Sequence, residues 1–343
     1  MDPLTHAVLG IAGALAATRK TENRRAGALA GFVAGTLPDA DVLLRSPHDP
    51  LFALEYHRHF THSVAFSPVI MLIGAGTAWL ILRGFRQRVA FTSLLLPALV
   101  AAWAHIVCDL WTSYGTRVFW PFRQDRLALD WISVIDPLMT LPLAALSLLA
   151  VLRKSRRAAI AGLGWVGFYL ALCVVQQHRA SVALGNWIAF RGHTAERVSV
   201  KSSFGNIIVW RGLYLAEGNY YASAIRPGRP GDVRLIPGES VPFLAGPATD
   251  DHDWQGFPAR STAVRDVRRF YHFSGDWVAW NPQAGGEVLG DLRYASMPAE
   301  FNPLWGIDLD RDNPQNHVQW VTFRRLNRTS FAPLWALIRG QGF

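Results

Sequence analysis

Residues 89–111, VAFTSLLLPALVAAWAHIVCDLW, decide the fold class, because they form an apolar stretch long enough to cross a bilayer as one helix. About 20 apolar residues are needed for one crossing. The end of this stretch contains His105 and Asp109, four positions apart and so on one helix face. Ionisable groups near the centre of a membrane helix cost about 2.5–3.5 kcal/mol each on insertion scales. We therefore expect this pair to have a function.

Similar apolar stretches occur elsewhere in the first half of the chain. They are residues 64–82, 135–152 and 158–175. Two shorter stretches rich in Ala and Gly, 4–18 and 26–37, precede them. Small residues let helices approach closely, so these two form a tight hairpin that either crosses the membrane or re-enters it. We expect an all-α transmembrane bundle of about six helices, and four at least, over residues 1–180.

Residues 181–343 have the composition of an ordinary soluble domain. Their β-branched and aromatic segments, such as 207–210, 220–225 and 277–280, are separated by clusters of Gly and Pro. This pattern is typical of strands joined by turns. The sequence therefore predicts a β-rich soluble C-terminal domain after the helical bundle.

The net charge of +9 does not indicate a nucleic-acid partner, because much of the basic charge lies in short loops between apolar stretches. Loops 19–25, 83–88 and 153–157 together hold eleven basic residues and one acidic residue. The alternate loops, 38–62 and 112–134, hold five basic and six acidic residues. The positive-inside rule places the first set in the cytoplasm. The second set, both chain ends and the β-rich domain are then expected on the periplasmic side of a bacterial inner membrane.

Histidines and aspartates recur at one end of the predicted helices, the end assigned to the outer face. The candidate metal ligands are His6, Asp39, His57, His62, His105, Asp109 and Asp136. The outer face is assigned from Lys and Arg alone, so the shared position of these histidines and aspartates is independent evidence that they meet there. Imidazoles and carboxylates together suit zinc, with manganese or iron as alternatives. We expect one to three divalent ions, favouring zinc.

Several of these residues allow another interpretation. His59 is a weaker candidate, since His57 and His62 already serve its segment, and Asp136 is equally suited to capping a helix. Asp41 is a candidate proton acceptor, and Arg58 a candidate group for steadying an anion. Arg117 and Arg123 could bind a phosphate, although a surface or headgroup contact suits each of them alone. His105 and Asp109 could also simply hydrogen-bond each other.

The ordered set of motifs resembles the YdjM-like, LexA-regulated family of membrane-bound metal-dependent hydrolases. The motifs are MDPLTH (1–6), LPDAD (37–41), HRHFTHS (57–63) and HIVCD (105–109), with TSYGT (112–116), WPF (120–122) and DP (136–137) in support. They cover about residues 1–180. The resemblance implies an inner-membrane hydrolase that is phospholipase-like.

The order of ligands is also similar to that of soluble zinc-dependent phospholipase C, a helical enzyme with three clustered metals. That similarity implies that His6, Asp39, His62, His105 and Asp109 are ligands and that metal-activated water hydrolyses a phosphodiester. A later His/Glu ligand pair is not evident, and Asp136 is the nearby candidate, so the number of ions stays open.

We therefore expect a hydrolase at the outer membrane–water boundary, acting on a phospholipid or another phosphate or acyl ester. Membrane lipid is the expected partner. Two alternatives remain: a metal transporter or sensor, and a structural protein whose metal ties helices together. Transport is disfavoured because the ligands gather at one face, whereas transporters place them near the midplane.

Overall fold

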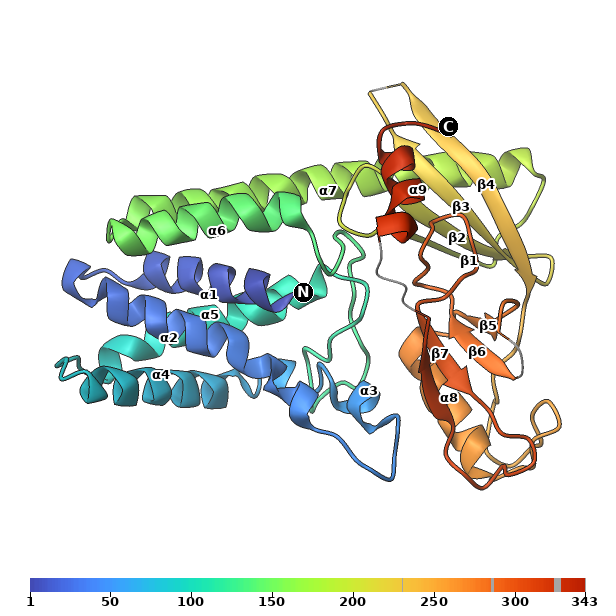
Figure 1. The fold of residues 1–343 in the computed structure, drawn as a ribbon, viewed down its shortest axis with the longest axis horizontal. Coiled ribbons are helices and arrows are strands. Elements are labelled where there is room, and N and C mark those ends of the chain that lie inside the picture. Colours follow the sequence, from blue (N-terminus) through green and yellow to red (C-terminus); the bar gives the residue numbers. More distant parts are fainter. Residues whose placement is uncertain (230, 285–286, 324–327, 343) are drawn as a thin grey trace. The chain divides into compact units, whose positions relative to one another are not determined.

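The computed structural model describes every residue except 230, 285–286, 324–327 and 343. The chain forms two compact units. The helical unit contains residues 1–44, 56–174 and 204–206, and the β-rich unit contains residues 45–55, 175–203 and 207–343. The expected fold class, a helical first half followed by a β-rich part, is confirmed (Figure 1).

Six long helices build or enter the helical unit. They are α1 (Pro3–Ala17), α2 (Arg24–Thr36), α4 (Ser67–Gly84), α5 (Thr92–Leu110), α6 (Pro137–Leu152) and α7 (Arg156–Phe190). Of the described helices, α4, α5 and α7 are long and apolar enough to cross a membrane, while α1 and α6 are apolar but shorter. Helix α7 is longer than the stretch expected from hydropathy, because residues 175–190 continue the helix within the β-rich unit.

Two aspartates begin helices in the same way. Asp2 precedes Pro3 and accepts a hydrogen bond of 3.0 Å from the Thr5 amide, which begins α1. Asp136 precedes Pro137 and accepts from the amides at the start of α6. Proline at the first helical position needs no amide partner, and the aspartate satisfies the free amides that follow. The start of α1 places His6 in its first turn.

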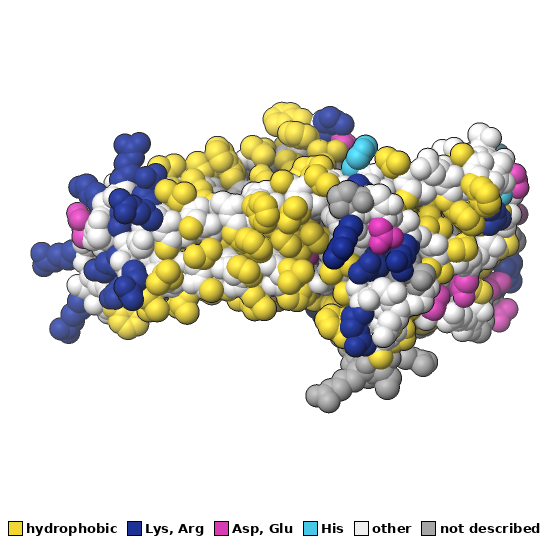
Figure 2. Space-filling model, turned by 90° about the horizontal axis from the view of Figure 1, so that it is seen from above, with side chains coloured by type: hydrophobic (Ala, Val, Ile, Leu, Met, Phe, Trp, Pro, Cys, Tyr) yellow, Lys and Arg dark blue, Asp and Glu magenta, His cyan; other side chains and the backbone are white. Residues whose placement is uncertain are grey.

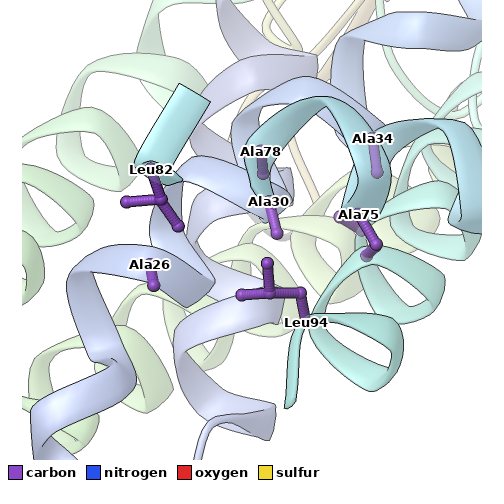
Figure 3. Packing of buried hydrophobic residues seen from close by; sticks show 9 residues of the cluster. Ala26, Ala30, Ala34, Ala75, Ala78, Leu82 and Leu94 are labelled. Atoms are coloured by element: carbon purple, nitrogen blue, oxygen red, sulfur yellow. The ribbon is translucent and has the colours of Figure 1, made fainter. Parts of the chain in front are cut away.

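Small residues let the helices pack closely, as their composition predicts. A Cβ atom built on Gly31 of α2 would lie 2.6 Å from the Gly10 carbonyl oxygen of α1. Alanines dominate the buried cluster between α2, α4 and α5, shown in Figure 3. Its members are Ala26, Ala30, Ala34, Ala75, Ala78, Leu82, Leu94, Ala98 and Ala101. This close approach brings the end of α2 against the last turns of α5.

Basic residues and the His and Asp motifs lie at opposite ends of the helical unit. Figure 2 shows Lys and Arg gathered at one end of the helical unit, where the loops 19–25, 83–88 and 153–157 lie, beside a band of hydrophobic side chains. Helix α1 starts at the opposite end, and α2 and α5 finish there. The His and Asp motifs belong to that second end.

The β-rich unit contains two antiparallel four-stranded sheets with the orders β1-β2-β3-β4 and β5-β6-β7-β8. The first is formed by β1 (Arg197–Ser202), β2 (Trp210–Ala216), β3 (Asn219–Pro227) and β4 (Val233–Pro242). The second is formed by β5 (Val278–Trp280), β6 (Val288–Asp291), β7 (Trp305–Asp308) and β8 (Gln319–Thr322). Helices α8 (Thr262–Ser274) and α9 (Arg328–Ile338) complete the unit. Leu213, Tyr220, Trp277 and Phe301 belong to one buried core in it.

Candidate metal centre

Four elements bring ionisable side chains together at one end of the helical unit. They are the first turn of α1, the short helix η2 (Leu37–Leu43), the short helix η3 (Phe60–His62) and the last turns of α5. Ligand atoms of His6, Asp39, His105 and Asp109 all lie within 4.8 Å of one another. We call these four residues the primary group. Together they could hold a metal ion.

The packing of α2 against α5 determines the orientation of His105. Its Nδ1 atom lies 2.7 Å from the carbonyl oxygen of Gly35, near the end of α2. A carbonyl only accepts, so Nδ1 carries the proton and donates it. The lone pair of His105 is therefore on Nε2, which faces the cluster. A ligating histidine is commonly fixed in this way by a partner on its other nitrogen.

His62 faces the same space from η3. Its Nε2 atom lies 2.9 Å from His105 Nε2, 3.2 Å from Asp109 Oδ2 and 3.5 Å from Asp39 Oδ1. His105 Nε2 lies 3.6 Å from each of the same two oxygens. Ligands bound about 2.0–2.2 Å from a tetrahedral ion are about 3.3–3.6 Å apart. Apart from the shorter distance of 2.9 Å between the two nitrogens, these distances of 3.2–3.6 Å are close to the spacing of a zinc ligand set.

Unsatisfied polar atoms in this cluster also fit a cation. Neither ring nitrogen of His6 makes a hydrogen bond, although Nε2 is 3.1 Å from Asp109 Oδ1, and Asp109 Oδ2 is likewise without one. Both side chains are fully buried. A buried polar atom without a partner costs about 1–3 kcal/mol. The residues present therefore fit a divalent metal ion, which would satisfy these atoms.

Arg58 lies inside the cluster rather than beside it. Its Nη2 atom is 3.0 Å from Asp109 Oδ1, its Nη1 donates to Thr112 Oγ1 at 2.8 Å, and its guanidinium lies over the ring of Tyr114. The amine of Met1 also contacts Asp109. Arg58 is 3% exposed, and its φ of 56° is a left-handed conformation that costs energy in a non-glycine residue. Arg58, expected to steady an anion, here neutralises a buried carboxylate.

Asp41 uses both carboxylate oxygens to hold neighbouring groups. Oδ1 lies 2.8 Å from His57 Nδ1, and Oδ2 accepts from the Arg58 amide and the Thr61 hydroxyl, each at 2.9 Å. His62 Nδ1 is 3.2 Å from the same Oδ2. Asp41, expected as a proton acceptor, thus orients His57 and His62. Asp39, Asp41 and His57 form a second group of converging ligand atoms, which shares Asp39 with the primary group.

The charges of this end of the unit are strongly coupled. Burial alone lowers the pKa of His62, but the carboxylates of Asp109, Asp39 and Asp41 raise it to about 10. Burial raises the pKa of Asp41, but hydrogen bonds with His57 and His62 reverse this and hold it well below its usual range. The pKa of Asp39 is lowered in the same way, by His62 and the other histidines against the effect of burial. These groups form one network of positive imidazole and negative carboxylates.

Asp136 belongs to none of the three groups of converging ligand atoms among the described residues. Its Oδ1 accepts from the amides of Leu138 and Met139, and the hydroxyl of Tyr169 donates to both carboxylate oxygens at 2.8 and 2.9 Å. Burial raises the pKa of Asp136. The structure thus gives Asp136 the capping role, the alternative to a metal ligand.

The remaining candidates, two arginines for phosphate binding and one histidine as a weaker metal ligand, contact other neighbours. The exposed side chain of Arg123 pairs with Asp125, and Arg117 donates to Gln124. His59 packs near the rings of Tyr56 and Trp120.

Sequence reasoning missed three groups that orient the candidate ligands. They are the Thr61 hydroxyl, the Gly35 carbonyl and the Tyr169 hydroxyl. Thr61 lies within the HRHFTHS motif, so its place between two histidines was a usable signal. A backbone carbonyl and a tyrosine 33 residues from its partner leave no local pattern.

Comparison with known proteins agrees with the motifs. A family model described as YdjM inner membrane protein matches residues 1–180. The uncharacterized protein YfhP of Bacillus subtilis (strain 168) is 28% identical over 186 residues, which are 51% of this chain and 55% of that protein. The chain thus spans about half the length of this curated relative. No solved structure matches the chain.

Proposed function

Because the chain belongs to the YdjM family of inner membrane proteins, we propose that it is a membrane-bound, metal-dependent hydrolase. The observation that carries the proposal is the convergence of His6, Asp39, His105 and Asp109, all but Asp39 fully buried, at one end of the helices. Ionisable residues in membrane segments are expensive and are usually functional. Close packing of the helices needs no ionisable groups, so three carboxylates and several imidazoles at one site indicate a function.

The primary group and His62 would hold the ion, and zinc suits their nitrogen and oxygen donors. A bound divalent ion would supply a Lewis acid that activates water and polarises an ester. Arg58 balances the charge of Asp109, so this carboxylate stays ionised and available in a buried site. His105 presents Nε2 because Gly35 accepts its other proton.

We assign proton transfer to His57, supported by Asp41. The His57 side chain is 23% exposed and that of Asp39 is 22% exposed, whereas His6, His62, His105 and Asp109 are fully buried. Substrate would therefore approach from the side of His57 and Asp39. The Asp41 carboxylate, 2.8 Å from His57 Nδ1, orients the ring toward the site. Asp41 thus takes part through His57 and does not meet substrate.

The position of the site favours a lipid substrate. The cluster lies at the ends of α1, α2 and α5, opposite the basic loops, so ester groups of a phospholipid would lie at a similar depth. The positive-inside rule assigns this end to the periplasmic side. We propose a phospholipid, or another phosphate or acyl ester at the membrane surface, as substrate.

A structural metal is the second candidate, because three of the primary ligands are fully buried. A structural ion has a closed shell of protein ligands, whereas a catalytic ion keeps an open position. An ion that exchanges slowly, in a protein with no lipid turnover, would favour the structural role.

The test uses the full chain in nanodiscs that contain phosphatidylethanolamine and phosphatidylglycerol. Metal content is measured by mass spectrometry, and headgroup release is followed by phosphorus NMR. We expect the wild type to contain zinc and release headgroups, and Asp109→Asn to lose both. His178→Ala is the matched control, because His178 is an exposed histidine of α7 outside both groups. Unchanged lipid turnover in a folded Asp109→Asn protein without metal would refute the proposal.

A further inference from the structure

Arg269 of α8 binds three carboxylates with one guanidinium. Nη1 and Nη2 donate to the two oxygens of Asp49 at 3.0 and 2.8 Å. Nε and Nη2 donate to Glu55 Oε2 at 3.1 and 2.9 Å, and Nη1 also donates to Asp266 Oδ1 at 3.0 Å. A two-pronged pair of this kind fixes geometry as well as charge. Arg269 therefore holds Asp49 and Glu55 in one defined position.

The two distant partners of Arg269 belong to a segment that connects candidate ligands. Residues 45–55 follow η2, which contains Asp39 and Asp41, and precede His57 by two positions. This segment is part of the β-rich unit, although the residues on both sides of it belong to the helical unit. Its own structure is ordered by Asp49, whose Oδ1 accepts from the amide of the buried Leu51 at 3.0 Å.

Asp266, which binds Arg269 on α8, is itself fixed by two further contacts. Asp266 Oδ1 receives Arg269, and its Oδ2 lies 2.7 Å from His317 Nδ1 and accepts from the Val318 amide at 3.2 Å. Asp266 is 1% exposed, whereas the side chains of Arg269 and His317 are 28% and 39% exposed, so the network is buried at Asp266 and reaches water at these two partners. A lone ion pair at a surface contributes little, but Arg269 is one member of a connected network. Its three acceptors compensate its charge together.

We propose that Arg269 is a positioning residue for the candidate metal centre, which it serves by clamping segment 45–55. The clamp orders the chain between Asp41 and His57. Less conformational entropy is therefore lost when the Asp41 carboxylate and His57 Nδ1 form their 2.8 Å contact. The effect of the clamp on the metal centre passes along the chain, because segment 45–55 connects Asp41 to His57. This inference rests on the metal centre proposed above.

Asp49, Asp266 and His317 could themselves be taken for a metal site, because their ligand atoms converge within 4.8 Å. The guanidinium of Arg269 already contacts both Asp49 and Asp266. Its positive charge is the counterion that a metal would otherwise supply. We therefore assign this group to the clamp.

The experiment measures cobalt affinity of the full chain in nanodiscs, by competition with a chelator and from the visible absorption of bound Co²⁺. We expect Arg269→Gln to weaken binding about tenfold, because residues of segment 45–55 must then be ordered when the metal binds. Arg269→Lys should recover part of the loss. Arg268→Gln is the matched control, because Arg268, the residue before Arg269, pairs with Asp250. We expect its affinity and absorption to match the wild type.

Equal cobalt affinity and absorption in Arg269→Gln and the wild type would overturn the clamp alone. A wild type that binds no cobalt or zinc would contradict the metal centre and the clamp together. If Arg269→Gln does not fold, Asp49→Asn takes its place, because it removes one partner and keeps Arg269 paired with Glu55 and Asp266. A loss of affinity there supports the clamp, and an unchanged affinity contradicts it.

Discussion

His62 and His105 face each other through their Nε2 atoms, 2.9 Å apart, although they are 43 residues apart in the chain. His105 donates its Nδ1 proton to the Gly35 carbonyl, so its Nε2 atom is an acceptor. In the metal-free protein, His62 must therefore carry the proton between the two rings. A cation bound at this point would replace that proton.

This arrangement predicts a pH-dependent stability for the metal-free protein. The carboxylates around His62 raise its pKa to about 10, above its ordinary value of 6.5, against the effect of burial. A raised pKa in the folded state stabilises the protein fully below pH 6.5, and this stabilisation declines as pH rises toward about 10. Thermal unfolding followed by circular dichroism, with chelator present, should show Tm falling across that range. His62→Gln should flatten the fall, and an equal slope in both proteins would contradict the assignment.

Asp41→Asn should weaken metal binding without removing a primary ligand. The amide cannot accept from His57, Arg58 and Thr61 with the strength of a carboxylate, so two imidazoles lose their fixed orientation. Loss of such a supporting group typically costs about 10–100-fold in metal affinity or activity. Chelator competition measures the effect. Asp125→Asn, at an exposed aspartate paired with Arg123, is the control and should leave affinity unchanged.

Asp136→Asn should keep its metal. Asn can cap α6 nearly as well as Asp, and burial already raises the pKa of Asp136 toward its neutral form. We expect a loss of about 1 kcal/mol or less in stability, from weaker bonds with Tyr169. Metal content by mass spectrometry and Tm by circular dichroism measure both effects. A stoichiometric loss of metal would return Asp136 to the list of ligands.

Gly31→Ala should damage both packing and the metal centre. Its Cβ would collide with Ala14 and lie 2.6 Å from the Gly10 carbonyl oxygen, so α1 and α2 must separate. Overpacking of this kind costs about 1–3 kcal/mol. Because α1 contains His6 and η2 follows α2, metal content should fall as well. Gly76→Ala on α4 is the control, since its Cβ meets nothing within 4 Å. Equal Tm values for the two variants would exclude this packing argument.

The helical first half, the β-rich second half and the family could all be predicted from local patterns. Apolar length, the alternation of basic loops and short motifs such as LPDAD and HRHFTHS are properties of neighbouring residues. Burial in lipid or in a core selects for them directly, so they are visible without coordinates. The same patterns identified the side chains that converge in the primary group, because each lies at the same end of its helix.

The partners of those side chains depended on the tertiary structure. Asp41 orients histidines, Arg58 neutralises Asp109, Asp136 caps α6, and Arg269 reaches Asp49 across 220 residues of sequence. A carboxylate or guanidinium can serve equally as ligand, cap or counterion. Its role is decided by which donors and acceptors packing brings within hydrogen-bond distance, and in this chain the close contact of α2 with α5 decides it for His105. Local sequence determines which groups reach the site, and only the packed helices determine what each group does there.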